Sequence, residues 1–259
     1  MIEHNMAEAT IVGGRGAMAS FFKPRLQSCG LRVHNLDKPL SRQESRERVP
    51  GSDLLLLAVP PEAVQQVLED LSGFLSRHTI LVDICSVKVR PLQRMLQMHQ
   101  GPVVGSHPLF GPDPDPQNPL RVALIRGRDE QGFRRVLDLL QKAGTHPFES
   151  EAEEHDKAMA YIQGLNFLSS MAYLAASAHA PSIEKYVTPS FERRLEAARK
   201  MLNEDARMFA DLFEANPHSL EALRSYRNHL DLAADGEVDL LLNKACWWWK
   251  EKDNSRGGV

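Results

Sequence analysis

The sequence predicts an α/β domain built on a doubly wound parallel sheet, followed by an all-α domain. Two observations predict this fold class. From residue 9 to about residue 148, short apolar runs alternate with helical patterns, which is typical of parallel strands joined by crossover helices. From residue 151 to residue 249 no strand-like run appears, and the helix formers Ala, Leu, Glu and Arg dominate. We therefore expect domains at residues 1–150 and 151–259.

Composition excludes several classes of protein. The 259 residues carry a formal net charge of −3, which gives no electrostatic case for binding nucleic acid. The hydrophobic share of 42% and the charged share of 25% exclude a disordered chain. Three scattered cysteines do not make a disulfide framework or a metal site, so we expect a reducing cytoplasmic compartment. No apolar run approaches the roughly 20 residues of a membrane span, and no targeting signal precedes the first strand.

Six apolar runs are the predicted strands. They are rich in Val, Ile and Leu without strict polar alternation, as expected of strands covered on both faces. Helical spacing of apolar residues between them predicts helices over residues 61–71 and 129–142. The runs are ATIVGG (9–14), LRVHNLD (31–37), DLLLLAVP (53–60), TILVDICS (79–86), GPVVGSHP (101–108) and RVALIRG (121–127).

A glycine-rich turn follows the first predicted strand and opens a helix. Its pattern is G-x-G-x-x-A, ending at Ala19. The first glycine permits a tight turn, the second lets the backbone approach a pyrophosphate, and the small third residue packs the helix on the strand. Amide groups at the helix N-terminus then face the phosphates. The turn predicts a Rossmann-type dinucleotide site that includes Gly14, Arg15, Gly16, Ala17 and Met18.

The second predicted strand ends at Asp37, about the right distance downstream for the ribose-binding carboxylate of such a site. A carboxylate there accepts hydrogen bonds from the ribose hydroxyls and repels a 2′-phosphate, so it favours NAD over NADP. Lys38 and Arg42 lie nearby and leave NADP open. Val59 and Pro60, at the end of the third run, complete the expected cofactor site. The alternatives are a glycine turn without a ligand and a methyltransferase site for an adenosyl cofactor.

Residues 152–180 form one long candidate helix. It is acidic in its first turn and apolar on nearly every face from Met159 to Ala178. A helix that is apolar all round has to be buried, and this half of the chain is small to bury it alone. We therefore expect a homodimer formed through the helical domain. The alternative is a helix packed wholly within its own domain.

Three further segments resemble the prephenate dehydrogenase family of tyrosine biosynthesis. They are VDICSVK (82–88), VVGSHPLFGPD (103–113) and EHDKAMAYIQGLNF (154–167). The resemblance runs from about residue 9 to residue 211, and the HP-x-FGP block is its most specific part. It implies an N-terminal Rossmann domain, a C-terminal helical dimerisation domain and NAD as cofactor. The implied reaction is oxidative decarboxylation of prephenate to 4-hydroxyphenylpyruvate, within aromatic amino acid biosynthesis.

The resemblance also implies site residues. His107 takes the position of the catalytic base, a role that suits a neutral histidine, and Ser86 lies near the nicotinamide and the substrate hydroxyl. Lys88 is expected to be structural. The implied substrate-binding residues are His155, Gln163, Arg199 and Lys200. No metal is expected.

Two departures from the family pattern leave the substrate open. Phe167 stands where several relatives have a histidine, and Lys200 stands where the family has a carboxylate-binding arginine. Lysine offers a point charge in place of a bidentate fork. Arogenate and 4-amino-4-deoxyprephenate are therefore alternative substrates. A further alternative is a non-catalytic dinucleotide-binding regulatory protein, against which the presence of both His107 and Ser86 argues.

Overall fold

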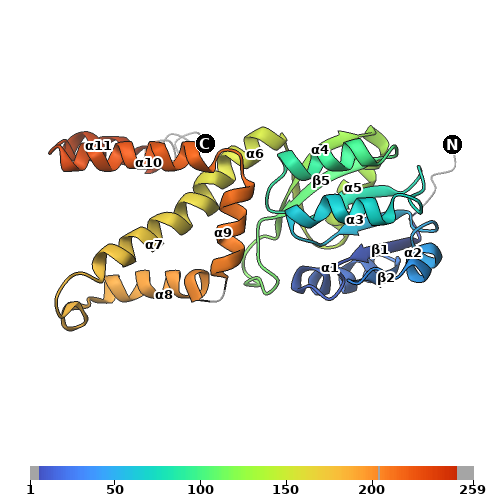
Figure 1. Ribbon diagram of the computed structural model, residues 1–259, viewed down its shortest axis with the longest axis horizontal. Helices are drawn as coiled ribbons and strands as arrows, with labels where there is room; N and C mark the ends of the chain where they lie inside the picture. Colours follow the sequence, from blue (N-terminus) through green and yellow to red (C-terminus); the bar gives the residue numbers. More distant parts are fainter. Residues whose placement is uncertain (1–5, 204, 250–259) are drawn as a thin grey trace, which may run out of the picture. The chain divides into compact units, whose positions relative to one another are not determined.

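The computed structural model describes residues 6–203 and 205–249, and the chain divides into two compact units, residues 1–159 and 160–259 (Figure 1). The first unit holds a seven-stranded sheet in the order β2-β1-β3-β4-β5-β6-β7. The strand order in the sheet reverses direction at β1, because β2 lies on one side of β1 and the chain then crosses to the other side to form β3. A crevice at such a switch point is where open α/β sheets bind ligands.

All neighbouring strands are parallel except β5 and β6, which are antiparallel. The predicted parallel sheet is confirmed up to β5. Beyond it the chain turns back, because the proline-rich segment 111–119 provides no crossover helix. The strands are β1 (Glu8–Val12), β2 (Arg32–Leu36), β3 (Leu54–Leu57), β4 (Ile80–Asp83), β5 (Val103–Pro108), β6 (Arg121–Arg128) and β7 (His146–Ser150). The edge strand β7 has no buried residue, which explains why no apolar run predicted it.

Helices cover both faces of this sheet. Apolar residues of α1 and α5 pack with Leu54 and Leu56 on one face, and those of α3 and α4 pack with Leu55 and Leu57 on the other. This alternation along β3 is the doubly wound arrangement that the sequence predicted. The helices are α1 (Ala17–Ser28), α2 (Arg42–Arg48), a 3₁₀ turn (Pro61–Ala63) leading into α3 (Val64–Leu71), α4 (Val89–Met98), α5 (Glu130–Lys142) and α6 (Ala152–Met159).

Helix α6 belongs to the first unit, because it packs against α4. The compact unit therefore ends at Met159 and not at residue 150, where the change in composition lies. The single helix expected over residues 152–180 is interrupted. It consists of α6, a π-helical turn (Ala160–Leu165) and α7 (Asn166–Ser177).

The second unit is all-helical, as the sequence predicted. After α7 come a 3₁₀ turn (Ile183–Tyr186), α8 (Pro189–Asn203), α9 (Ala206–Ala215), α10 (Ser219–Ala234) and α11 (Val238–Ala245). Few of its side chains are buried, and Met171 and Tyr173 of α7 are 36% and 40% exposed. In the described part of the chain, no helix combines the length and the apolar character needed to cross a membrane.

Gly13 and Gly30 offer a matched test of the turn after β1. Both have positive φ, at +83° and +91°, but a Cβ on Gly13 would lie 2.4 Å from the Ala58 oxygen, whereas a Cβ on Gly30 would meet nothing within 4 Å. Gly30→Ala should cost about 1–2 kcal/mol of backbone strain. Gly13→Ala should cost a further ~1–3 kcal/mol from overpacking. Urea unfolding measures both, and equal losses would contradict the close packing of this turn.

Candidate active site

The turn after β1 is packed too closely to hold side chains. Gly13 donates its N–H to the Leu36 oxygen at 2.8 Å, and its positive φ and its approach to Ala58 require glycine. A Cβ on Gly14 would lie 2.4 Å from the Asn35 side chain of β2. The sequence pattern, counted from Gly14, missed the role of Gly13. The doubled glycine directly after the strand was the available signal.

The N-terminus of α1 fits a phosphate group. Gly16 is the N-cap residue of α1 and has no side chain to cap it, and the first turn carries no acidic residue. The first N–H groups of a helix have no partner within the helix, and the helix dipole adds partial positive charge there. The backbone N–H groups of Ala17 and Met18, in the first turn of α1, therefore offer uncapped donors in a place where a pyrophosphate can approach.

Asp37 is held at this turn from the end of β2. One carboxylate oxygen, Oδ1, accepts the backbone N–H of Arg15 at 2.8 Å, and the other lies 3.8 Å from the Arg15 Nε. The Arg15 side chain is 84% exposed. Val59 is half-buried beside Gly13, and Pro60 is exposed. The residues predicted to bind the cofactor thus lie along the carboxyl edge of the sheet, at the switch point next to β1.

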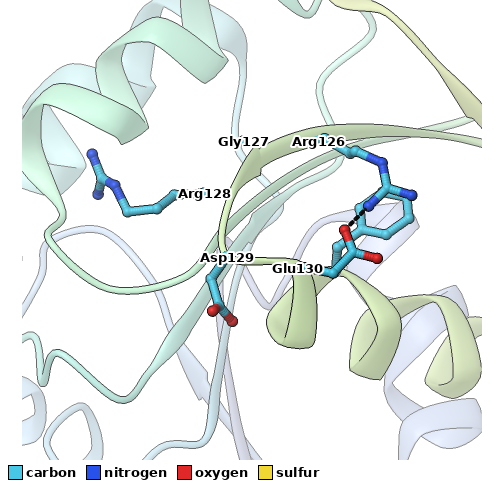
Figure 2. A pocket seen from close by; sticks show the side chains of 6 residues that line it. Arg126, Gly127, Arg128, Asp129 and Glu130 are labelled. Atoms are coloured by element: carbon cyan, nitrogen blue, oxygen red, sulfur yellow. Dashed lines mark hydrogen bonds and ion pairs between the residues drawn. The ribbon is translucent and has the colours of Figure 1, made fainter.

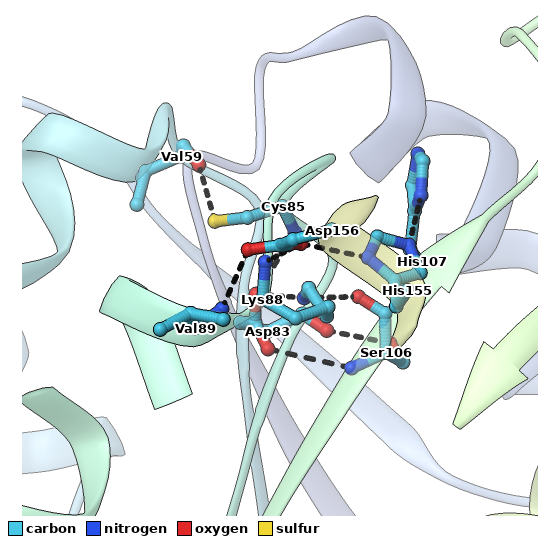
Figure 3. A network of polar contacts seen from close by, with 9 residues as sticks. All are labelled: Val59, Asp83, Cys85, Lys88, Val89, Ser106, His107, His155 and Asp156. Atoms are coloured by element: carbon cyan, nitrogen blue, oxygen red, sulfur yellow. Dashed lines mark hydrogen bonds and ion pairs between the residues drawn. The ribbon is translucent and has the colours of Figure 1, made fainter. Parts of the chain in front are cut away.

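A chain of three polar side chains lies at the carboxyl end of β5 (Figure 3). The Nδ1 of His107 lies 2.9 Å from the Nε2 of His155, and the Nδ1 of His155 lies 2.8 Å from the Oδ1 of Asp156. Asp156 also accepts two backbone N–H groups at the start of α4, from Lys88 at 2.7 Å and from Val89 at 2.9 Å. His107 is only 3% exposed. Helix α6 therefore brings His155 directly to the predicted base.

A buried ion pair fixes the backbone beside His107. Lys88 and Asp83 are both fully buried and form a salt bridge, and Lys88 also donates to the Ser106 oxygen at 2.5 Å. The Ser106 hydroxyl donates to the Asp83 backbone oxygen at 2.5 Å. The ends of β4 and β5 are thus tied together. This arrangement agrees with the structural role expected for Lys88.

The surroundings of His107 favour its neutral form. Burial holds the pKa of His107 well below its ordinary value, and the neighbouring His155 and Lys88 act in the same direction. Within the described residues, Nε2 of His107 forms no hydrogen bond. It is also not among the fully enclosed polar atoms that lack a partner, so this nitrogen is open to a ligand. A neutral imidazole with one open nitrogen is what a general base requires.

The remaining predicted residues are placed less completely. Ser86 is half-buried in the bend after β4, and the described part of the chain gives its side chain no hydrogen bond, so its role stays a prediction. In the second unit, Gln163 lies half-buried in the π-helical turn. Arg199 is exposed on α8, 3.7 Å from Glu196. The side chain of Lys200 lies outside the described residues.

Phe167, the other departure from the family pattern, is a core residue of the second unit. Its side chain is 2% exposed, and its ring stacks on Phe209 at a centroid distance of 5.6 Å. An imidazole at this position would be buried against a phenyl ring. The aromatic pair gives a packing reason for phenylalanine here.

A hollow of about 200 Å³ lies beside the start of α5 (Figure 2). Its cations are already engaged. Arg126 pairs with Glu130 and Glu149, and Arg128 donates to the carbonyl oxygens of Leu96 and His99. Figure 2 shows the Arg128 side chain pointing away from Arg126. These two arginines therefore tie the ends of α4 and α5 to their surroundings.

The Asp83–Lys88 pair generates a stability prediction. Lys88→Met leaves the Asp83 carboxylate buried without its charge partner, which should cost about 3–5 kcal/mol of unfolding free energy. The double variant Asp83→Asn/Lys88→Met removes both charges and should recover part of that loss. Denaturant unfolding of the two variants measures the difference. If Lys88→Met were as stable as the double variant, the result would contradict the buried Asp83–Lys88 ion pair.

Two family models match the chain. The nucleotide-binding domain of prephenate dehydrogenase matches residues 34–119, and the dimerization domain of prephenate dehydrogenase matches residues 151–236. Together the matches cover about two thirds of the chain. The T-protein of Enterobacter agglomerans is 31% identical over 220 residues, which are 83% of this chain and 58% of that protein. The 4-amino-4-deoxyprephenate dehydrogenase of Streptomyces pristinaespiralis is 28% identical over 180 residues, 63% of this chain and 60% of that protein.

A solved structure agrees with the fold. Prephenate dehydrogenase from A. aeolicus, in complex with hydroxyphenyl propionate and NAD⁺, superposes with a TM-score of 0.79 at 19% identity and covers 98% of both chains. The present chain spans less than two thirds of the length of the T-proteins that it matches. The resemblance found in the sequence motifs is confirmed, and the chain belongs to the prephenate dehydrogenase family.

Proposed function

We propose that the chain is an NAD-dependent dehydrogenase of tyrosine biosynthesis that oxidatively decarboxylates prephenate or a close cyclohexadienyl acid. The observation that carries this proposal is the buried His107 at the carboxyl end of β5, where burial lowers its pKa, on the same sheet edge as the glycine turn after β1. We further propose that the protein works in the cytoplasm as a homodimer. Its free cysteines Cys29, Cys85 and Cys246 suit a reducing compartment.

The cofactor is NAD. The uncapped amides at the start of α1 hold the pyrophosphate, and the carboxylate of Asp37 accepts the ribose hydroxyls. Bound NAD⁺ supplies a hydride acceptor. The family's nucleotide-binding model and the NAD⁺ in the similar A. aeolicus structure support this choice. The exposed side chain of Arg15 also lies close to Asp37, and its positive charge offsets the charge of the carboxylate. Discrimination against a 2′-phosphate therefore depends on the Asp37 carboxylate itself and not on the net charge of the site.

The protein's part in the reaction is a proton transfer and the binding of two carboxylates. The Nε2 of His107 accepts the proton of the C4 hydroxyl as the hydride leaves the ring C4. The ring carboxylate then leaves as CO₂, and the electron pair of its bond restores aromaticity with the negative charge on the C4 oxygen. The protonated His107 returns its proton to this phenolate, which gives the phenol and regenerates the base. Ser86, in the bend after β4, is assigned the role that the family resemblance implies, which is to orient His107 or to share the proton. Gln163, Arg199 and Lys200 stay the substrate-binding residues that the family resemblance predicts.

The side chain and ring substituent of the substrate stay open between three acids. Prephenate, arogenate and 4-amino-4-deoxyprephenate differ by an amino group on the side chain or on the ring. The Streptomyces pristinaespiralis relative acts on the third of these, at 28% identity. A lysine at residue 200 still provides a cation for a carboxylate, but without the directional fork of arginine.

The decisive experiment follows NADH formation and CO₂ release with each of the three acids, for the wild-type protein and for His107→Asn. The variant keeps a polar side chain but cannot take the proton, so kcat should fall by about 10²- to 10⁴-fold with KM little changed. The wild-type profile of kcat/KM should fall only at pH values below the ordinary histidine pKa, because His107 must be neutral and its pKa is lowered. This acidic limb should be absent from the variant.

Two outcomes would contradict the proposal. If no acid supports NADH formation although NAD⁺ binds, the alternative of a dinucleotide-binding regulatory protein replaces it. If His107→Asn retains the wild-type kcat on the best substrate, His107 is structural and another group is the base.

Assembly is tested separately, because the second unit exposes many large apolar side chains. On α10 and α11 these include Leu230, Val238, Leu240 and Leu242, which are 43–59% exposed, and Trp247, Trp248 and Trp249 follow at 53–67%. A domain that leaves such residues exposed in one subunit is expected to bury them against another. Light scattering at micromolar concentration should give twice the 29.1 kDa chain mass. Leu240→Glu/Leu242→Glu should shift the protein toward the monomer, and a monomeric wild type would overturn the proposal.

A further inference from the structure

The geometry points to His155 as a positioning residue that, held by Asp156, fixes the tautomer of His107 so that its Nε2 is the proton acceptor. This inference rests on the proposed function for His107. It replaces the expectation that His155 binds substrate directly. The three side chains lie in the first unit, on β5 and α6, and their contacts are therefore internal to one compact body.

The direction of each hydrogen bond in the series His107–His155–Asp156 follows from Asp156, its last member. Its Oδ1 already accepts the backbone N–H of Lys88 at 2.7 Å, and its Oδ2 accepts the N–H of Val89 at 2.9 Å. An ionised carboxylate only accepts hydrogen bonds, so it has no hydrogen to give to a ring nitrogen. The Nδ1 of His155 must therefore donate to Oδ1, across 2.8 Å.

The next bond is then determined. A neutral His155 that carries its hydrogen on Nδ1 has a lone pair on Nε2. The Nδ1 of His107, 2.9 Å away, must donate to it. A neutral His107 with its hydrogen on Nδ1 carries a lone pair on Nε2, the nitrogen that forms no hydrogen bond within the described residues. The tautomer needed for the base is thus set at a distance, by a carboxylate that never touches the substrate.

The same series of hydrogen bonds stabilises the His107 imidazolium that proton transfer produces. When Nε2 of His107 takes the hydroxyl proton, the imidazolium keeps its Nδ1–H bond to the neutral Nε2 of His155, and this bond becomes charge-assisted. Other charged groups near His107 come from the segment around β4, where Lys88 pairs with Asp83. Their charges offset each other. Asp156, on the far side of His155, accepts the Nδ1–H of His155 and so keeps the Nε2 of His155 available as an acceptor for the imidazolium.

Burial explains why this arrangement is stiff. His155 is 4% exposed and Asp156 is fully buried, and the two histidine rings meet at 76° with their centroids 5.0 Å apart. A residue that bound the substrate would have to present a polar atom to it. Both ring nitrogens of His155 are already engaged, one by Asp156 and one by His107.

The test compares His155→Leu, His155→Gln and a matched control, His99→Leu. His99 is also buried, at 3% exposure, and its ring forms a hydrogen bond only with the Thr79 oxygen in the described part of the chain, so His99→Leu measures the structural cost of losing a buried imidazole. Asp156 is a poorer target, because it also holds the start of α4. Glutamine places an amide oxygen near the position of Nε2 and can accept from His107.

We expect His155→Leu to lower kcat by about 10²- to 10⁴-fold with KM changed by no more than about threefold, the range of a misoriented base. His155→Gln should restore at least about tenfold of that loss, and His99→Leu should keep the wild-type kcat whatever its Tm. A wild-type kcat for His155→Leu would overturn the inference. A change confined to KM would also overturn it and return His155 to substrate binding.

A second readout needs no turnover. In ¹⁵N spectra of histidine-labelled protein with NAD⁺ alone, the Nδ1 of His107 should be protonated and Nε2 unprotonated in the wild type, with signals assigned by their loss in His107→Asn. In His155→Leu the two tautomers should mix. An unchanged His107 tautomer would overturn the inference. Because this measurement uses no substrate, it separates failure of the tautomer argument from failure of the proposed activity.

Discussion

The candidate site depends on one buried carboxylate. Asp156 is fully buried, and a buried carboxylate is costly unless hydrogen bonds satisfy its oxygens. It receives them from two backbone amides at the start of α4 and from His155. These hydrogen bonds connect α6 to the start of α4, and α6 is the last helix of the first compact unit. They also hold the imidazole of His155 next to His107. The Nδ1 of His107 bonds this imidazole, so the bonds of Asp156 also hold the orientation of His107.

The sheet supplies the second constraint. Strands β1 to β5 are mutually parallel, so their carboxyl ends share one edge. The glycine turn, Asp37, Val59, Ser86 and His107 each follow or end a strand on that edge. Topology therefore brings residues far apart in the chain to the same edge, and the Asp83–Lys88 pair ties the end of β4 to β5, the strand that carries His107. The cofactor turn and the base need no direct contact to belong to one site.

Much of this organisation was predictable. Six of the seven strands appear as apolar runs, because strands covered on both faces need continuous Val, Ile and Leu. The edge strand β7 and the antiparallel pairing of β6 were not predictable, since an exposed edge leaves no apolar run and strand direction leaves no mark in composition. The interruption of the long helix at Ala160–Leu165 was also missed, because a π-helical turn shifts the register by one residue without a distinctive sequence.

The sequence by itself determined the residue types that the proposed chemistry needs: a glycine turn, a carboxylate after the second strand, a histidine at the end of the fifth strand and the motifs that place the chain in its family. Local patterns can do this because each motif lies within a few consecutive residues. Only the tertiary structure decided how His107, His155 and Asp156 relate. His107 and His155 are 48 positions apart, and the direction of the hydrogen bond between them depends on amides of a third segment that no periodicity could have connected to them.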